Sequence, residues 1–143
     1  MEFRDLKKQY LKYENEIDLA IKKVMLETHF ISGSQVKQLE ERFAKYVGVK
    51  HCITCANGTD ALSLVLMAWG IGQGDAVFVP NYTFFATAEV VSYVGATPIF
   101  VDVYEDTFNI DIEHLERQIK KVIKESILKP RVIIPVDLFG LLA

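Results

Sequence analysis

Residues 53–66 read Ile-Thr-Cys-Ala-Asn-Gly-Thr-Asp-Ala-Leu-Ser-Leu-Val-Leu, and this stretch guides the interpretation of the whole chain. It predicts a buried strand, a tight Asn57-Gly58 turn and a helix that opens on small polar residues. The backbone N–H groups of Gly58, Thr59 and Asp60 would converge at the helix N-terminus, where the helix dipole favours an anion. A phosphate group suits this spot, because a side chain at position 58 would crowd it. The alternative is a structural turn made by Gly58, with Asp60 as the helix cap.

The composition is that of a folded globular protein. The chain has 143 residues, of which 50% are hydrophobic and 24% charged, and its net charge is −3. This length suffices for a domain with its own core, and the charge balance offers no basic surface for nucleic acid. No apolar run approaches the roughly 20 residues that cross a bilayer, and the N-terminus lacks the apolar segment of a signal peptide. We therefore expect a cytoplasmic protein that binds neither nucleic acid nor membranes.

Cys52 and Cys55 form a C-x-x-C pair, a spacing that also occurs in zinc and redox sites. No second pair follows, and the three histidines have no ligand-like spacing. On a strand, a separation of three residues points the two sulfur atoms to opposite faces. We expect ordinary buried thiols and no metal site.

Two amphipathic helices are predicted before the first strand. Apolar residues recur every three or four positions from about residue 4 to residue 28, and again after Ser34. We expect Ser34 to cap the second helix and Gly48 to end it. Residues 1–48 are thus predicted to be an N-terminal helical arm, packed on the main domain or on a partner subunit.

From residue 51 the chain alternates between continuous apolar strands and helices, which predicts the α/β class with a mostly parallel sheet flanked by helices. The helix over residues 59–69 is apolar nearly all round, so we expect it to be buried on most sides. Thr83 is expected to cap the next helix, and Asp111 the last one. Strands are predicted at residues 51–55, 76–79, 97–103 and 131–136, and the two later helices at residues 84–94 and 112–123.

The sequence stops shortly after the last predicted strand, at residues 137–143. No helix follows to cover the sheet, and the last strand would leave an unpaired edge and apolar surface. We expect residues 49–143 to be an incomplete, truncated large domain, and the chain to be the N-terminal part of a longer protein.

Six segments occur in an order that is typical of one family: Phe30-Ile31-Ser32-Gly33, Ala56-Asn57-Gly58-Thr59-Asp60-Ala61-Leu62, residues 80–88, Gly95-Ala96-Thr97-Pro98, residues 102–111 and Pro135-Val136-Asp137-Leu138-Phe139-Gly140. Together they resemble the DegT/DnrJ/EryC1/StrS family of nucleotide-sugar aminotransferases. The resemblance implies pyridoxal 5'-phosphate (PLP) as cofactor and the large domain of a fold-type-I PLP-dependent transferase. The opening residues 2–7 and the run over residues 55–62 are most similar to members that aminate UDP-2-acetamido-2-deoxy-3-keto-glucuronic acid.

The resemblance implies roles for four cofactor-binding residues. Gly58 and Thr59 would hold the PLP phosphate through their backbone N–H groups and the Thr59 hydroxyl, and the N–H of Asp60 would add a third contact. Phe84 matches the aromatic residue that stacks on the pyridine ring of the cofactor. The alternative for Phe84 is a core position beside Phe85.

The resemblance also implies substrate contacts from an earlier segment. Phe30, Ile31 and Gly33 match the residues that approach the nucleotide sugar, although a break between two helices would require Gly33 in any case. Asp102 and Asp137 lie at strand ends, where we expect them to cap turns or helices rather than to act in catalysis.

Two catalytic groups have no counterpart in these 143 residues. Transamination needs a lysine that forms the Schiff base with PLP and an aspartate that keeps the pyridine nitrogen protonated. In the family both follow the segment that matches residues 138–140, and none of the lysines here has that context. We therefore expect the fragment to contain no catalytic residue and to be inactive by itself, contributing the positioning of the cofactor.

Three functions remain open from the sequence. The first is a PLP-dependent aminotransferase that moves the amino group of glutamate to a keto group of a nucleotide-linked sugar, for cell-surface polysaccharide or related biosynthesis. The second is a sugar dehydratase or deoxygenase of the same fold, with a histidine in place of the lysine. The third is a truncated, non-catalytic module that dimerises. The resemblance implies a homodimer with active sites at the subunit interface.

Overall fold

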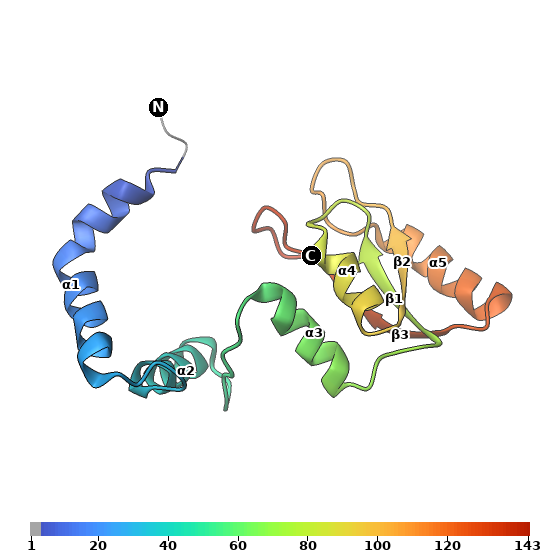
Figure 1. The fold of residues 1–143 in the computed structure, drawn as a ribbon. Helices are drawn as coiled ribbons and strands as arrows, with labels where there is room; N and C mark the ends of the chain where they lie inside the picture. Colours follow the sequence, from blue (N-terminus) through green and yellow to red (C-terminus); the bar gives the residue numbers. More distant parts are fainter. Residues whose placement is uncertain (1–3) are drawn as a thin grey trace. The chain divides into compact units, whose positions relative to one another are not determined.

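A computed structural model describes residues 4–143 of the chain. The contacts divide the chain into two units, the first ending at Thr54 and the second running from Cys55 to Ala143. The two units are described one at a time, with the element labels of Figure 1. Every helix among the described residues is too short or too polar to cross a lipid bilayer.

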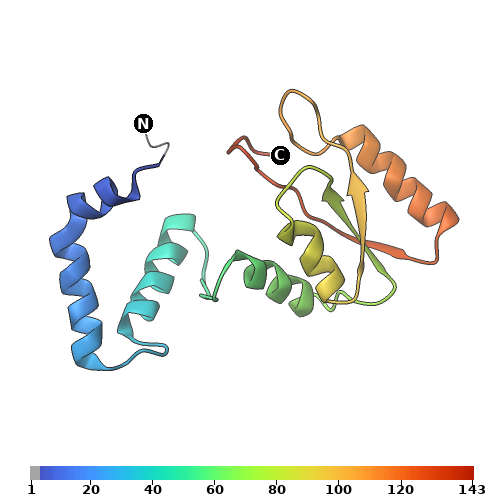
Figure 2. The ribbon, with the colours of Figure 1, turned by 45° about the horizontal axis from the view of Figure 1, so that its top comes forward.

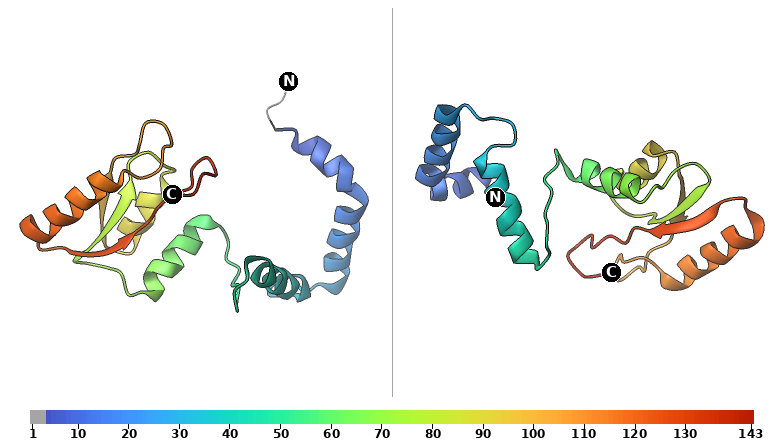
Figure 3. Two further views of the ribbon diagram at one scale, coloured as in Figure 1. Left: turned by 180° about the vertical axis from the view of Figure 1, so that it is seen from behind. Right: turned by 90° about the horizontal axis from the view of Figure 1, so that it is seen from below.

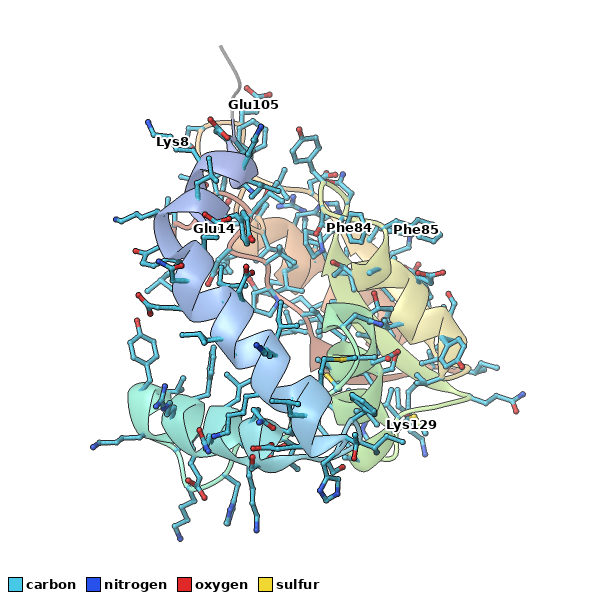
Figure 4. All side chains as sticks on the ribbon, turned by 60° about the vertical axis from the view of Figure 1, so that its left-hand side comes forward. Lys8, Glu14, Phe84, Phe85, Glu105 and Lys129 are labelled. Atoms are coloured by element: carbon cyan, nitrogen blue, oxygen red, sulfur yellow. The ribbon has the colours of Figure 1, made fainter. Side chains whose placement is uncertain are left out.

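The first unit consists of the two predicted helices, α1 (Leu6–Glu27) and α2 (Ser34–Val47). Asp5 caps α1, because its Oδ1 atom accepts a hydrogen bond from the backbone N–H of Lys8 at 2.8 Å. No residue of α1 is buried. Lys8 and Glu14, which Figure 4 labels, are among its exposed side chains.

Of the two predicted ends of helix α2, only the C-terminal one is confirmed. Gly48 ends the helix as predicted, with a φ of 79° that glycine adopts without strain. The prediction that Ser34 caps the helix was wrong. Gly33 is the cap residue and Ser34 is already helical, so no side chain accepts a hydrogen bond at this end.

Residues 51–55 form no strand, so this prediction was also wrong. No segment among residues 4–143 pairs with them, and an extended segment becomes a strand only when a neighbour takes up its backbone hydrogen bonds. The backbone N–H and the hydroxyl of Thr54 instead donate to Oε1 of Glu40, each at 2.9 Å. A side chain from α2 therefore replaces a strand partner for this segment.

The second unit contains a parallel sheet in the order β2-β1-β3. Helix α5 covers one face, while α3 and α4 cover the other, as Figure 1 and the view from below in Figure 3 show. This arrangement confirms the predicted α/β class with a parallel sheet flanked by helices. In chain order the elements are α3 (Gly58–Ala68), β1 (Asp75–Pro80), α4 (Ala86–Tyr93), β2 (Thr97–Val101), α5 (Ile112–Glu125) and β3 (Lys129–Ile133).

The central strand β1 is buried on both faces, which explains the continuous apolar run over residues 76–79 of the sequence. Val77 and Val79 belong to the core formed with α3 and α4. Ala76 and Phe78 belong to the core formed with α5. Successive side chains of a strand alternate between faces, so one strand contributes to both cores.

The strand β3 begins at Lys129, two residues earlier than predicted, and includes Pro130. Pro130 pairs with Ala76, and the register between the strands shifts directly after this pair. A proline lacks a backbone N–H and is tolerated at such an irregularity, because no ladder hydrogen bond is lost there.

Helix α3 is less buried than its composition predicted. Within it only Ser63 and Leu66 are buried, whereas Leu64, Met67 and the adjacent Trp69 are each at least half exposed. Among the described residues, α4 is the helix that packs beside α3 (Figure 2). Leu66 also packs on the sheet, against Val77 and Val79, but most of the other apolar side chains of α3 stay at least partly exposed, so the prediction of burial on most sides was wrong for this chain.

Candidate active site

The carboxyl ends of the parallel strands and the N-termini of α3 and α4 lie at the same end of the second unit. Figures 1 and 2 show the two helices side by side, running in the same direction and opposite to the strands. Ligands of α/β sheets bind beyond the carboxyl ends of the strands. The predicted cofactor residues Gly58, Thr59, Asp60 and Phe84 come from segments that begin or pass at this end.

Asn57 is the residue that caps α3. Its Oδ1 atom accepts a hydrogen bond from the backbone N–H of Asp60 at 2.9 Å, and its carbonyl accepts from Ala61 at 3.1 Å. The alternative in which Asp60 caps the helix is therefore wrong. Asp60 is the third residue of the helix, and its Oδ2 atom accepts from the side-chain amide of Asn57 at 3.3 Å.

The cap leaves two backbone donors at the start of α3. The N–H groups of Gly58 and Thr59 have no acceptor within residues 4–143, as is usual for the first turn of a helix. The N–H of Asp60, predicted as a third donor, is engaged by Asn57. Two backbone N–H groups and the Thr59 hydroxyl are thus available to an anion at this end of the helix.

Neither the backbone nor the packing of the described chain requires a glycine at position 58. Gly58 does not have a positive φ, and a Cβ atom built on it would meet no heavy atom within 4 Å. The alternative in which Gly58 only makes the turn therefore has no conformational support. Empty space beside two unpaired N–H groups is the geometry that an anion-binding helix N-terminus needs.

A hollow of about 190 Å³ lies between α3 and α4 next to this helix start. Ser63 is buried at its base, where its hydroxyl donates to the carbonyl of Thr59 at 3.0 Å. The carboxylates of Asp60 and Glu89 are part of the wall and disfavour an anion inside the hollow itself. The lining residues are Thr59, Asp60, Ser63, Glu89, Val90 and Tyr93.

Phe84 lies on the segment between β1 and α4, and its side chain is 74% exposed. Figure 4 shows Phe84 and Phe85 at the start of α4. The alternative of a core position for Phe84 is thus wrong for this chain, and the ring is available to a ligand. Thr83 does not cap α4 as predicted, because the helix starts after Phe85 and the Thr83 hydroxyl pairs with that of Thr87 at 3.0 Å.

The two aspartates at strand ends differ in their roles. Asp137 stabilises a turn as predicted, since its carbonyl accepts from the N–H of Gly140 at 3.0 Å and its carboxylate from that of Ala143 at 2.9 Å. Asp102 caps no helix. Its carboxylate contacts the side chains of Asn81 and His114, two residues that the sequence analysis did not identify. No local sequence signal marks these two, because they come from separate segments.

Aromatic side chains from the segments that follow the three strands are packed together. The ring centroids of Tyr82 and Phe108 are 5.1 Å apart, and those of Phe108 and Phe139 are 5.4 Å apart. Phe108 has a φ of 59°, an unusual value for an aromatic residue. The side-chain amide of Asn109 donates to the carbonyl of Leu142 at 2.8 Å, which further joins the second and third of these segments.

The predicted substrate residues belong to the first unit. Phe30 and Ile31 are 61% and 84% exposed. Gly33 is buried, and a Cβ atom there would approach the carbonyl oxygen of His29 to 2.6 Å, so local packing is sufficient to explain this glycine. Gly33 also lines a hollow of about 390 Å³ that reaches Thr54. The contact of these residues with a nucleotide sugar stays a prediction.

The two cysteines are less buried than predicted. Cys52 is half-buried and Cys55 is exposed, because residues 51–55 are not part of a sheet. The thiol of Cys55 donates to the carbonyl of Asn57 at 3.3 Å. Within residues 4–143, no three His, Cys, Asp or Glu side chains converge in a way that could hold a metal ion.

All twelve lysines of the chain are exposed: Lys7, Lys8, Lys12, Lys22, Lys23, Lys37, Lys45, Lys50, Lys120, Lys121, Lys124 and Lys129. Lys129 lies at the start of β3, and Figure 4 shows it at the opposite end of the sheet from Phe84. None of the four lysines of the second unit follows the carboxyl end of a strand.

The chain is similar to proteins of one known family. The sequence model of the DegT/DnrJ/EryC1/StrS aminotransferase family matches residues 12–143. The UDP-2-acetamido-2-deoxy-3-oxo-D-glucuronate aminotransferase of Pseudomonas aeruginosa is 44% identical over 140 residues, which cover 98% of this chain and 37% of that protein. The chain thus spans little more than a third of the length of this relative.

Solved structures of other proteins also superpose on this chain. A DegT DnrJ EryC1 StrS aminotransferase from Brucella abortus superposes with a TM-score of 0.97 at 54% identity, covering 100% of this chain and 38% of that chain. NtdA from Bacillus subtilis, solved with bound cofactor PMP, has a TM-score of 0.82 at 30% identity, covering 92% of this chain and 29% of that chain.

Proposed function

Since this chain belongs to the DegT/DnrJ/EryC1/StrS aminotransferase family, we propose that the whole protein is a PLP-dependent sugar aminotransferase. Glutamate would supply the amino group, and the acceptor would be a keto group of a nucleotide-linked sugar. The name of the Pseudomonas relative supports a 3-keto UDP-N-acetylhexosaminuronic acid as the acceptor. The aminated sugar would serve cell-surface polysaccharide or related biosynthesis in the cytoplasm.

The main structural support for this proposal is the N-terminus of helix α3. Gly58 and Thr59 present two backbone N–H groups without an acceptor in the described chain, and Thr59 adds a hydroxyl. The helix dipole adds positive potential at the same place. The space beside Gly58 is open in the described chain, because a Cβ atom built there would have no heavy atom within 4 Å. The residues present therefore fit a phosphate group such as that of PLP.

The chain's own residues would bind and orient the cofactor. Gly58 and Thr59 would hold the phosphate, and the N–H of Asp60 would stay with Asn57 to keep the helix start in place. Phe84, exposed beyond β1, would stack its ring on the pyridine ring. When bound, PLP supplies the electron sink that lets an amino group pass from donor to acceptor. Contacts at both the phosphate and the pyridine ring would restrict the orientation of the cofactor, which lowers the entropic part of the activation barrier.

We further propose that the lysine that bonds covalently to PLP lies outside residues 1–143. A reactive lysine is normally desolvated in a pocket, whereas every lysine here is exposed. Residues 49–143 would then be part of a larger PLP-binding domain, inactive without the remainder. A homodimer that completes the site is also proposed, supported by the apolar side chains left exposed on α1, such as Leu11 and Leu19.

The binding half of the proposal is tested with the 143-residue chain. Equilibrium dialysis should show binding of PLP and several-fold weaker binding of pyridoxal, which lacks the phosphate. Gly58→Ala should weaken PLP binding, because the new methyl group enters the space assigned to the phosphate. Equal binding of PLP and pyridoxal would contradict the phosphate site.

The catalytic half is tested with the whole protein. Incubation with PLP, glutamate and the 3-keto UDP-sugar should produce 2-oxoglutarate and a UDP-amino sugar, both detected by mass spectrometry. Omitting PLP or glutamate should stop both products. Loss of water from the sugar without amination would overturn the aminotransferase proposal in favour of a dehydratase.

A further inference from the structure

One carboxylate connects three segments at the ligand-binding end of the second unit. Asp102 directly follows β2, and its Oδ1 atom accepts a hydrogen bond from the side-chain amide of Asn81 at 2.6 Å. Its Oδ2 atom is 2.8 Å from Nδ1 of His114. Asn81 begins the segment after β1, and His114 lies in the first turn of α5.

Backbone hydrogen bonds hold the base of this arrangement. The N–H of Asn81 donates to the carbonyl of Val101 at 2.8 Å, and the N–H of Asp111 donates to the carbonyl of Asp102 at 2.8 Å. The backbone nitrogen of Asp102 is also 3.0 Å from Nδ1 of His114. The backbone of Asp102 is therefore held on two sides, and its 61% exposed side chain reaches Asn81 from this fixed position.

Two other contacts restrain the start of the segment over residues 81–85: the backbone hydrogen bond from Asn81 to Val101 and the contact of the Tyr82 ring with Phe108. Its side chains make two hydrogen bonds within the described chain, that of Asn81 with Asp102 and that of Thr83 with Thr87. Phe84 and Phe85 are both more than 70% exposed, and α4 has no side-chain cap. At 74% exposure, the Phe84 ring is not fixed in direction by packing within residues 4–143.

We propose that Asp102 is a positioning residue for the cofactor ring. By holding Asn81 it restrains residues 81–85 and thereby sets the direction of Phe84. The inference rests on the proposed function, in which Phe84 stacks on the pyridine ring of PLP. Asp102 does not itself touch the cofactor in this account, and it transfers no proton.

The first experiment measures the restraint without any cofactor. Hydrogen exchange of a peptide covering residues 81–89 is compared in the wild type, Asp102→Ala, Asn81→Ala and the double variant. The backbone N–H groups of Thr87 and Glu89 report directly, because they donate to the carbonyls of Phe84 and Phe85. We expect exchange to accelerate about three- to tenfold in each single variant, the range for losing one hydrogen bond, with no further increase in the double variant.

Two further variants separate positioning from general destabilisation. Asp106 also lies in the segment after β2, and its carboxylate makes no hydrogen bond in the described chain. Asp106→Ala should therefore leave the hydrogen exchange of residues 81–89 unchanged. Asp102→Asn keeps an oxygen that can accept from Asn81, so it should restore most of the protection. A peptide from β1 should exchange at the wild-type rate in all variants.

The second experiment measures PLP affinity by equilibrium dialysis in the same variants. Asp102→Ala should raise the Kd several-fold while Asp106→Ala and Asp102→Asn leave it near the wild-type value. Accelerated exchange with an unchanged Kd would overturn the assigned role toward Phe84. Unchanged exchange in Asp102→Ala would overturn the restraint itself, even where the wild type binds PLP. A wild type that binds no PLP would overturn the proposed function instead, and the exchange data would still decide whether Asp102 holds the segment.

Discussion

Asn57 and Asp60 form a reciprocal pair at the start of α3. The Oδ1 atom of Asn57 accepts the backbone N–H of Asp60 at 2.9 Å, and the side-chain amide of Asn57 donates to Oδ2 of Asp60 at 3.3 Å. The pair orders the first turn of the helix and leaves the N–H groups of Gly58 and Thr59 facing outward from its end. The proposed phosphate site therefore depends on a cap that lies beside it.

Replacing this cap should destabilise the protein modestly. Asn57→Ala is expected to lower the free energy of unfolding by about 1 kcal/mol, because the N–H of Asp60 loses its acceptor. Asn57→Ser retains a capping oxygen and should lie within a few tenths of a kcal/mol of the wild type. Denaturant titration measures both. An equal loss for Ala and Ser would show that the capping oxygen has no part in the effect.

Gly58 should be replaceable without loss of stability. Gly58→Ala is expected to keep or raise the free energy of unfolding, because position 58 has no positive φ and no near neighbour, and alanine favours helices by roughly 0.5–1 kcal/mol. Gly48→Ala is the matched contrast, since a φ of 79° should make it destabilising by about 1–2 kcal/mol. Thermal unfolding of both variants checks the sign. Strong destabilisation by Gly58→Ala would show that folding, not ligand binding, needs the glycine.

Two phenylalanines should respond differently to truncation. Phe78 is 1% exposed in the core between β1 and α5, so Phe78→Ala should cost about 3–5 kcal/mol through lost burial and a cavity. Phe84 is 74% exposed, and Phe84→Ala should change the free energy of unfolding by about 0.5 kcal/mol or less. Denaturant unfolding of the two variants provides the comparison. Similar losses in both would place the Phe84 ring in a packed environment and contradict its availability to a ligand.

Acidification should release residues 51–54 from α2. The pKa of Glu40 is lowered from its usual value of 4.5, first by the hydrogen bond from the backbone N–H of Thr54 and second by that from its hydroxyl. A lowered folded-state pKa means that the stabilisation is complete above pH 4.5 and disappears as the pH falls through the lower value. Protection of the Thr54 amide in NMR hydrogen exchange should therefore decline below pH 4.5.

The matched variant for this prediction is Glu40→Gln. Its neutral amide does not titrate, so the dependence of Thr54 protection on pH should disappear while weaker protection remains. A pH dependence that persists in Glu40→Gln would assign the effect to another group.

Elements with a complete local signal were predictable. Helix α5 starts after Asp111, whose carboxylate accepts from His114 N–H at 2.9 Å, and its cap was evident from the sequence alone. Residues 76–79 of β1 were recognisable as a strand because a segment buried on both faces of a sheet is a continuous apolar run. The end of α2 at Gly48 was predictable because the left-handed conformation there suits glycine.

Signals that need a partner were misleading. Residues 51–55 have the composition of a strand, but Glu40 rather than a neighbouring strand takes the N–H of Thr54. The apolar composition of α3 predicted burial on most sides, but the described chain buries this helix only where it faces the sheet and α4. Ser34 and Thr83 are good capping residues by type, yet one is already helical and the other pairs with Thr87.

By itself the sequence determined the α/β class, most of the helices and strands, and the similarity to a family of sugar aminotransferases, because periodicity, caps and motifs are local properties of a chain. The tertiary structure alone brought Asp102 into contact with Asn81, 21 residues away, and with His114, 12 residues away. The physical reason is that these contacts arise only when β1 and β2 pair and α5 packs on them, so that segments far apart in the chain share one end of the sheet.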